Sequence, residues 1–286
     1  MRIINGLEAS KKIIIALKKE VELMDIKPGL GIILVGNRKD SQTYINMKKR
    51  KCNEVEILNH DVFLPENISE SELLIELDKL NNNPQIHGIL IQLPLPSHIN
   101  LLTIFKNIKI EKDIEGFHPQ NMGNLVLNNY YDYCLPCTPK GCIELLDLYN
   151  IELKGKNVVV IGKSNVVGLP LSLLLLNREA TVSICHVYTE KLKMYTLLAD
   201  ILIVACGKAH LIDKSHIKEG AIILDIGINH IEDKTSKKGY KIVGDVNFED
   251  VKDKVSMITP VPGGIGPMTI AMLLKNTVMA AKSSKS

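Results

Sequence analysis

The sequence predicts an α/β fold of two domains, the second of them built on a doubly wound parallel sheet. The chain has 286 residues, enough for two domains of roughly 150 residues each. Short apolar runs alternate with longer segments of helical spacing, and strands that are apolar throughout are typical of a parallel sheet covered by helices on both faces. Hydrophobic residues make up 45% of the chain and charged residues 23%, which argues against a disordered chain.

The first half of the chain alternates between helix and strand signals. Ser69 and Glu72 have the spacing of a capping box, which opens a helix. The elements expected here are, in order, a helix over 10–24, a strand over 29–36, a helix over 41–56, an extended segment over 57–64, a helix from 69, and a strand over 88–93.

The change of domain is expected near Pro139, where Thr138 is suited to cap a new helix and proline to its first position. A second β-α-β series follows. Its strands are expected at 157–161, 181–185, 201–205, 221–225 and 241–243, and a last helix at 266–281. The predicted domains are therefore 1–138 with 266–286, and 139–265.

Composition and charge exclude several classes of protein. The net charge is +3, and the 35 cationic residues divide into 31 Lys and 4 Arg spread along the chain, which argues against nucleic-acid binding. No apolar window is long enough to span a membrane, and the N-terminus lacks a secretory pattern, so we expect a soluble, cytoplasmic protein. The six cysteines are too few for a disulfide scaffold, and Cys134 with Cys137 lacks a second pair, so no metal site is expected.

A glycine loop after the strand at 157–161 indicates a dinucleotide site of Rossmann type. Gly162 directly follows the strand, where backbone N–H groups could approach a pyrophosphate at a helix N-terminus. The loop departs from the usual G-x-G-x-x-G pattern, because Ser164 takes the middle glycine position and Gly168 closes the loop one residue late. An ordinary glycine turn is the competing interpretation.

The end of the next strand favours NADP over NAD as the cofactor. An NAD site places Asp or Glu there to accept from the ribose 2′-hydroxyl, and this chain has His186 and Val187. No carboxylate would repel a 2′-phosphate, and Lys163 in the glycine loop could pair with one. NAD remains possible.

Eight stretches in one order carry a resemblance to a known family. They are Val35-Gly36, Ser41-x-x-Tyr44-x-x-x-Lys48, Gly88–Pro96, Lys112–Phe117, Pro136–Pro139, Asp225–Asn229, Gly244–Val246 and Thr259–Met268. Over essentially its whole length the chain resembles the bifunctional methylenetetrahydrofolate dehydrogenase/methenyltetrahydrofolate cyclohydrolase family. The resemblance implies an α/β catalytic domain facing a Rossmann domain across a folate-binding cleft, in a homodimer. It also implies NADP-dependent oxidation of 5,10-methylenetetrahydrofolate, then hydrolysis of the methenyl product to 10-formyltetrahydrofolate.

The resemblance also implies roles for individual residues. Tyr44 would lean on the folate and Lys48 would be the catalytic amine; their i, i+4 spacing puts both on one helix face. Gln92 ends an apolar strand at its carboxyl edge, where its amide could hold Lys48 or the attacking water; a capped strand end is the competing interpretation. Neighbouring Lys51 and a cationic substrate would both favour the neutral form of Lys48. Without the resemblance, Lys48 reads as part of a solvated basic helix face.

Further residues would bind the two ligands. Glu115 stands where the family usually has Asp, whose carboxylate grips the pterin. Asp113 is the fallback ligand, although a structural role is the stronger interpretation of that residue. Pro262, Gly263 and Gly264 would let backbone pass close to the substrate, and a plain turn is the competing interpretation. The residues expected at the cofactor are Gly162, Lys163, Ser164, Gly168, Val187 and Ile228. Lys163 and Val187 replace the family's usual Arg and Ser, which relaxes the expected preference for NADP.

Two other functions compete with this interpretation. One is an NAD(P)-dependent oxidoreductase acting on another small substrate, against which the joint presence of Tyr44, Lys48 and Gln92 argues. The other is a non-catalytic protein that binds nucleotides or nucleic acid, suggested only by the lysine excess. Binding of nucleic acid with a steep salt dependence would support it.

Overall fold

The computed structural model describes residues 1–233, 235–236 and 239–284, except for the side chains of five residues at 39–41 and 43–44. The chain divides into two compact units. The three-stranded unit comprises residues 11–137 and 270–286, and the six-stranded unit comprises residues 1–10 and 138–269. Each is described by itself.

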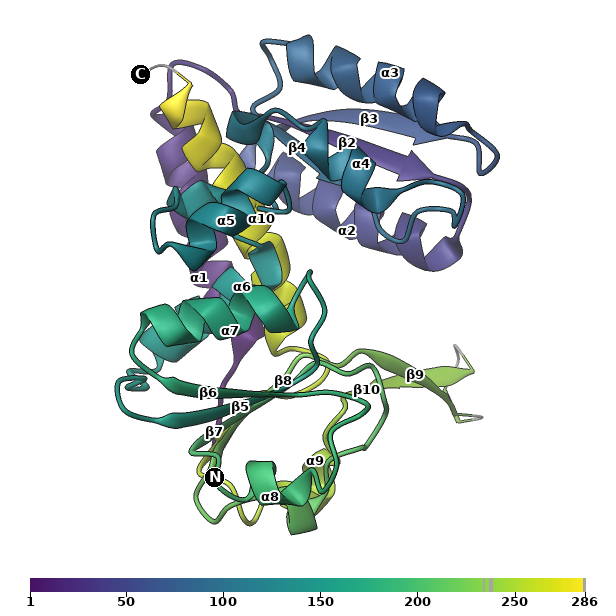
Figure 1. Cartoon of the computed structure of the whole chain (residues 1–286). Helices are drawn as coiled ribbons and strands as arrows, with labels where there is room; N and C mark the ends of the chain where they lie inside the picture. The colour runs from purple at the N-terminus through teal and green to yellow at the C-terminus, as the bar shows by residue number, and fades with distance from the viewer. Residues whose placement is uncertain (234, 237–238, 285–286) are drawn as a thin grey trace. The chain divides into compact units, whose positions relative to one another are not determined.

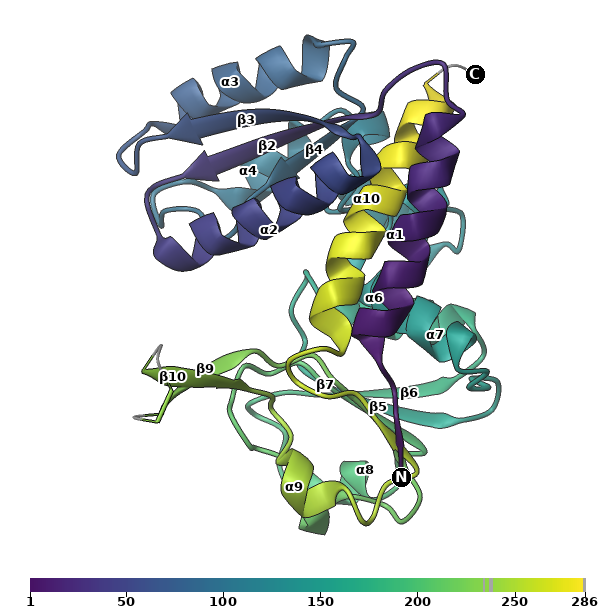
Figure 2. The same ribbon diagram turned by 180° about the vertical axis from the view of Figure 1, so that it is seen from behind.

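The three-stranded unit is built on a parallel sheet of order β3-β2-β4. Its strands are β2 (Gly29–Val35), β3 (Leu58–Leu64) and β4 (Gly88–Ile91). Strand β2 lies in the centre and is buried along its whole length, as its unbroken apolar sequence predicts. Helix α3 (Glu70–Asn82) covers one face of this sheet and α2 (Lys39–Val55) the other (Figures 1 and 2).

Local sequence signals fix the ends of these helices. The capping box at α3 is confirmed, because the Ser69 hydroxyl accepts from the Glu72 N–H at 3.2 Å and the Glu72 carboxylate accepts from the Ser69 N–H at 2.9 Å. The remaining elements of this unit are shorter. They are α4 (Leu101–Lys106), the 3₁₀ turns η1 (Ile110–Lys112) and η2 (Asp132–Cys134), and α5 (Pro119–Val126).

The six-stranded unit contains the doubly wound parallel sheet, in the order β1-β11-β8-β7-β5-β6. Its strands are β1 (Arg2–Ile3), β5 (Asn157–Ile161), β6 (Thr181–Cys185), β7 (Ile201–Val204), β8 (Ile222–Asp225) and β11 (Met257–Ile258). Helix α7 (Gly168–Asn177) lies on one face, and α8 (Lys193–Thr196) with α9 (Phe248–Val251) on the other (Figures 1 and 2). The predicted fold class is confirmed.

Helices α1 (Gly6–Glu22), α6 (Cys137–Leu148) and α10 (Ile265–Ser283) contain the unit boundaries. The sequence predicts that Thr138 caps α6 from outside. Helix α6 begins at Cys137, so Thr138 lies inside the helix and this prediction is wrong. Among the described residues, no helix is long and apolar enough to cross a membrane.

Two parts of the fold differ from the sequence prediction. Residues 1–10 were expected in the domain with 11–138, but β1 pairs in parallel with β11 and so belongs to the six-stranded sheet. The segment at 241–243 was expected to continue the β-α-β series. Instead β10 (Tyr240–Val243) pairs antiparallel with β9 (Asn229–Glu232) in a separate ribbon, because a short connection favours an antiparallel partner.

Candidate active site

Lys48 and Gln92 form the centre of the candidate site in the three-stranded unit. The Lys48 Nζ donates a hydrogen bond to Gln92 Oε1 at 2.9 Å. Gln92 directly follows β4 and its backbone N–H donates to Ile33 O at 2.9 Å, which places it at the carboxyl edge of the sheet. Its Nε2 donates to Leu93 O at 2.9 Å, so the amide group is oriented with its oxygen toward the amine.

Burial shifts the Lys48 amine toward its neutral form. The side chain is half-buried, and desolvation lowers the pKa of its amine, while the negative forms of Glu115, Cys137 and Cys52 oppose this shift. Lys51, to which the sequence analysis gave this effect, is not the cause. Its amine is paired with the Glu54 carboxylate at 2.6 Å. The four consecutive basic residues at 48–51 therefore do not form one uniformly solvated face.

Glu115 lies in the loop after η1, and its charge is coupled to that of Lys48. Burial raises the pKa of Glu115 to about 7; nearby Lys48 lowers it and Asp113 raises it further. Within the described part of the chain, no hydrogen bond or ion pair engages the Glu115 carboxylate. Its oxygens thus remain available to a ligand.

Asp113 supports the loop that carries Glu115. It is 1% exposed, and its carboxylate accepts from Phe117 N at 3.2 Å, from His118 N at 2.8 Å and from Asn121 Nδ2 at 2.8 Å. All of these partners belong to the protein, so Asp113 is structural and does not serve as the fallback pterin ligand.

Two further contacts fix the Glu115 loop. Buried Asn276 of α10 donates to Ile114 O at 2.8 Å and to Leu135 O at 3.0 Å. Gly116 has φ of +69°, and a Cβ there would lie 2.2 Å from Cys134 O. Only glycine fits at this position.

Tyr44 lies on α2, one turn before Lys48. Its side chain lies outside the described residues. Its predicted role at the folate therefore stays a prediction.

The geometry of the glycine loop in the six-stranded unit explains why Ser164 replaces the middle glycine and why Gly168 comes one residue late. Gly162 has φ of +122°, and a Cβ there would lie 2.2 Å from Ala205 O. A Cβ on Gly168 would lie 1.9 Å from Gly162 O, so the late glycine is where helix α7 packs on the loop. Ser164 Oγ accepts from Val167 N at 3.1 Å and from Gly168 N at 3.5 Å, so the serine stabilises the turn into α7.

The other residues expected at the cofactor are exposed. Val187 is 87% exposed in the segment after β6, and Ile228 is 43% exposed just before β9. Lys163 is exposed, and among the described residues it has no hydrogen bond or ion pair. The tight glycine turn and the uncommitted cation fit a dinucleotide with an additional phosphate.

The Pro262-Gly263-Gly264 segment belongs to the six-stranded unit, unlike Lys48. Gly263 has φ of +108°, and its carbonyl accepts from Leu7 N at 2.8 Å. A Cβ on Gly264 would lie 2.6 Å from Pro260 O. Close packing within its own unit is therefore one reason for glycine at 264, which the sequence analysis had attributed to the substrate.

Comparison with known proteins decides the family. Residues 4–115 match the catalytic domain of the tetrahydrofolate dehydrogenase/cyclohydrolase family, and residues 136–285 match its NAD(P)-binding domain. The chain belongs to this family. A bifunctional protein FolD from a Nitratiruptor species is 52% identical over 289 residues, which cover 100% of this chain and 99% of the relative.

Solved structures of family members agree over the full length. The bifunctional FolD enzyme from Campylobacter jejuni is 47% identical, with a TM-score of 0.95 and coverage of 99% of both chains. The FolD of Trypanosoma brucei, solved in complex with NADP cofactor and an inhibitor, is 38% identical with a TM-score of 0.95, covering 99% of this chain and 98% of its own.

Two buried residues of this family member received no role in the sequence analysis. Asp225 is the last residue of β8 and Asp245 follows β10, and both carboxylates accept hydrogen bonds from several loops of the six-stranded unit. Burial raises the pKa of Asp225 to about 7. The only signal in the sequence was their position in two of the resembling stretches, Asp225–Asn229 and Gly244–Val246.

Proposed function

We propose that the chain carries out two successive reactions on tetrahydrofolate. The first oxidises 5,10-methylenetetrahydrofolate to the 5,10-methenyl form with NADP, and the second hydrolyses that product to 10-formyltetrahydrofolate. The observation that carries this proposal is the hydrogen bond between Lys48 and Gln92 at the carboxyl edge of the sheet, with the Glu115 carboxylate in electrostatic contact with the amine.

Lys48 is the general base of the hydrolysis. A neutral amine has two N–H groups and one lone pair, and donating one N–H to Gln92 Oε1 at 2.9 Å orients the lone pair. The amine takes a proton from the water that attacks the methenyl carbon. The bond between that carbon and N5 then breaks, N5 takes up a proton, and the formyl group remains on N10. Burial lowers the pKa of Lys48 and so increases the fraction of neutral base.

Glu115 binds the pterin in this proposal. Its carboxylate accepts paired hydrogen bonds from the amino-pyrimidine edge, and the loop contacts of Asp113 and Asn276 hold it in place. Tyr44 leans on the folate, and the Pro262–Gly264 backbone lies against the substrate, as the family resemblance implies.

The glycine loop binds the cofactor. Gly162 and Gly168 shape the turn that lets the backbone, through the Ser164 N–H, approach the pyrophosphate. Lys163 pairs with the 2′-phosphate, and Val187 and Ile228 contact the nucleotide by their exposed side chains. When bound, NADP supplies the hydride acceptor of the oxidation. This step requires orientation by the protein and no base.

Localisation and assembly are part of the proposal. We place the protein in the cytoplasm as a homodimer, on the strength of the family resemblance. Light scattering on purified protein that gives the mass of a single chain would contradict the dimer.

An absorbance assay tests the proposed function. Purified protein is mixed with 5,10-methylenetetrahydrofolate and either NADP or NAD, and formation of reduced cofactor is followed. A second assay follows loss of methenyltetrahydrofolate without cofactor, against the uncatalysed rate. We expect turnover in both, faster with NADP than with NAD. A protein that is inactive in both assays refutes the proposal.

A further inference from the structure

Two carboxylates are buried together below the carboxyl edge of the six-stranded sheet, and the proposed reactions use neither. Asp225 is 3% exposed and Asp245 is 0% exposed. Glycines make the space for them. A Cβ on Gly244 would lie 1.8 Å from Asp225 Oδ2, and a Cβ on Gly227 would lie 2.3 Å from Asp245 Cγ.

Asp225 fixes the backbone around Asp245. Its Oδ1 accepts from Gly227 N and Asp245 N, both at 3.0 Å, and its Oδ2 accepts from Val246 N at 2.9 Å. The Asp225 N–H itself donates to Thr259 Oγ1 at 2.8 Å. Asp225, at the end of β8, therefore fixes the backbone position from which the Asp245 side chain extends.

Asp245 in turn holds two other loops. Its Oδ2 accepts from Cys206 N at 2.7 Å and from Gly207 N at 2.9 Å, just after β7, and its Oδ1 accepts from Asn229 Nδ2 at 2.8 Å. The first of these loops adjoins the glycine loop, since Ala205 O lies only 2.2 Å from where a Cβ on Gly162 would be. The second partner directly follows Ile228.

We propose that Asp245 is a positioning residue for the nicotinamide cofactor. One carboxylate ties together the loop that abuts Gly162 and the residue next to Ile228, so that both are fixed before the dinucleotide arrives at this edge of the sheet. This inference rests on the proposed function, in which Gly162 and Ile228 lie at the NADP site.

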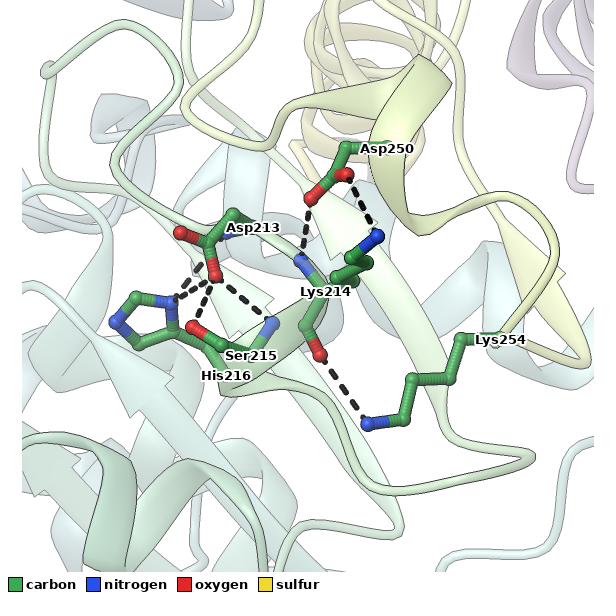
Figure 3. A network of polar contacts seen from close by, with 6 residues as sticks. All are labelled: Asp213, Lys214, Ser215, His216, Asp250 and Lys254. Atoms are coloured by element: carbon green, nitrogen blue, oxygen red, sulfur yellow. Dashed lines mark hydrogen bonds and ion pairs between the residues drawn. The ribbon is translucent and has the colours of Figure 1, made fainter.

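The backbone of Asp245 is also anchored without its side chain. Its carbonyl accepts from Ile212 N at 3.1 Å, and Asn247 N donates to Ile212 O at 2.8 Å. The segment after Ile212 is itself fixed to α9 by the network in Figure 3, in which Lys214 N donates to Asp250 Oδ2 at 2.7 Å and Lys254 Nζ donates to Lys214 O at 3.2 Å. Loss of the carboxylate therefore acts on the two loops that it holds.

Substitution Asp245→Asn tests the proposal. An amide cannot accept from both sides, because one of its two polar atoms is an N–H₂ that would face either the Cys206 and Gly207 N–H groups or Asn229 Nδ2. We expect calorimetry to show an NADP dissociation constant at least ten times that of the unmodified protein. Hydrogen exchange at Cys206 and Gly207 should be faster, while hydrolysis of methenyltetrahydrofolate, which uses no cofactor, should stay within about twofold.

Asp200→Asn is the matched control. Asp200 accepts from Asn157 N at 2.9 Å and from Lys218 Nζ at 2.6 Å at the opposite, amino edge of the same sheet. This variant should bind NADP as the unmodified protein does. Asn229→Ala removes one partner of Asp245 and leaves the carboxylate in place; it should raise the dissociation constant about threefold, and it decides the question if Asp245→Asn does not fold.

The outcomes separate this proposal from the proposed function. Unmodified protein that binds neither NADP nor NAD overturns both. NADP binding that is unchanged in Asp245→Asn, or in Asn229→Ala when Asp245→Asn does not fold, overturns only the positioning role. Equal losses of NADP affinity and of hydrolysis would also overturn it, because they would show a general structural role.

Discussion

The Lys48 amine donates to the Gln92 side-chain oxygen at 2.9 Å, across 44 residues of sequence. One residue comes from a helix and the other from the end of a neighbouring strand, so the sheet and its covering helix together determine the geometry of this pair. The pair gives the amine a fixed direction, and burial favours its neutral form.

Lys48→Met should lower the rate of methenyltetrahydrofolate hydrolysis by about 100-fold or more, since it removes the general base. Folding, measured by circular dichroism and thermal unfolding, should be nearly unchanged, because the side chain is only half-buried. Lys51→Met on the same helix removes a surface ion pair with Glu54 and should leave hydrolysis intact. Hydrolysis at the unmodified rate in Lys48→Met would exclude Lys48 as the base.

Gln92→Glu should shift the pH profile of hydrolysis toward higher pH by about 1–2 units. A carboxylate at hydrogen-bond distance favours the charged amine, so Lys48 would lose its proton only at higher pH. Activity at neutral pH should therefore fall. Gln85→Glu, at an exposed position of the same unit, adds the same charge and should leave the profile unchanged. An unshifted profile in Gln92→Glu would argue against Lys48 as the titrating base.

Glu115 should make the protein less stable as the pH rises. Its pKa is about 7 in the folded state against an ordinary value of 4.5, so the folded protein binds the extra proton between these values. The stabilisation that this proton gives the folded protein is complete below pH 4.5 and is lost as the pH rises through 7, by an amount on the order of 3 kcal/mol.

Urea unfolding at pH 5.5 and pH 8 measures this effect. The decrease in the free energy of unfolding should be smaller in Glu115→Gln than in the unmodified protein. Glu111→Gln, at an exposed position of η1, should retain the full decrease. Equal decreases in all three proteins would show that Glu115 is ionised at its ordinary pKa.

Gly116→Ala should destabilise the protein by about 2–4 kcal/mol, because φ of +69° disfavours any side chain and a Cβ would lie 2.2 Å from Cys134 O. Gly123→Ala is the control, since that glycine lies inside α5 with no atom within 4 Å of the added Cβ. It should be neutral or stabilising by about 0.5–1 kcal/mol. Chemical denaturation compares the two variants, and equal effects would contradict the steric argument.

Lys163→Ala should bring the affinities for NADP and NAD close to each other. A single exposed Lys–phosphate pair contributes on the order of 1–2 kcal/mol, or about tenfold in affinity, and less at high salt. Binding of NAD should change little. Lys154→Ala, which removes an exposed cation paired with Glu179, should preserve the preference for NADP. A preference that survives in Lys163→Ala would assign phosphate recognition to another group.

Periodicity predicted the elements that carry the site better than it predicted their contacts. Helix α2 and strand β4 follow the expected spacing closely, and so the placement of Lys48 and Gln92 on them was predictable. The cause of the lowered Lys48 pKa was not, because burial by residues distant in sequence leaves no local pattern. Strands β1 and β11 have two residues each, too few to show alternation.

The role of Asp245 could not be read from the sequence for a related reason. Most of its partners are backbone N–H groups, which every residue type except proline carries. The residue types at 206 and 207 therefore do not indicate that their backbone N–H groups donate to Asp245. The departures in the glycine loop were visible in the sequence, but only the structure shows that Ser164 stabilises the start of α7.

The interleaving of the two units constrains how the chain is made and how it can be divided. Arg2 and Ile3 can pair with their partner strand only after Met257 and Ile258 have been synthesised. The carbonyls of Ile114 and Leu135 can accept their hydrogen bonds only after Asn276 has been synthesised. The three-stranded unit therefore cannot finish folding on the ribosome before the six-stranded unit has been synthesised, in contrast to the N-terminal-first folding usual for multidomain chains. A gene cut between residues 137 and 138 would yield two incomplete fragments, and an autonomous half would require splicing of distant segments.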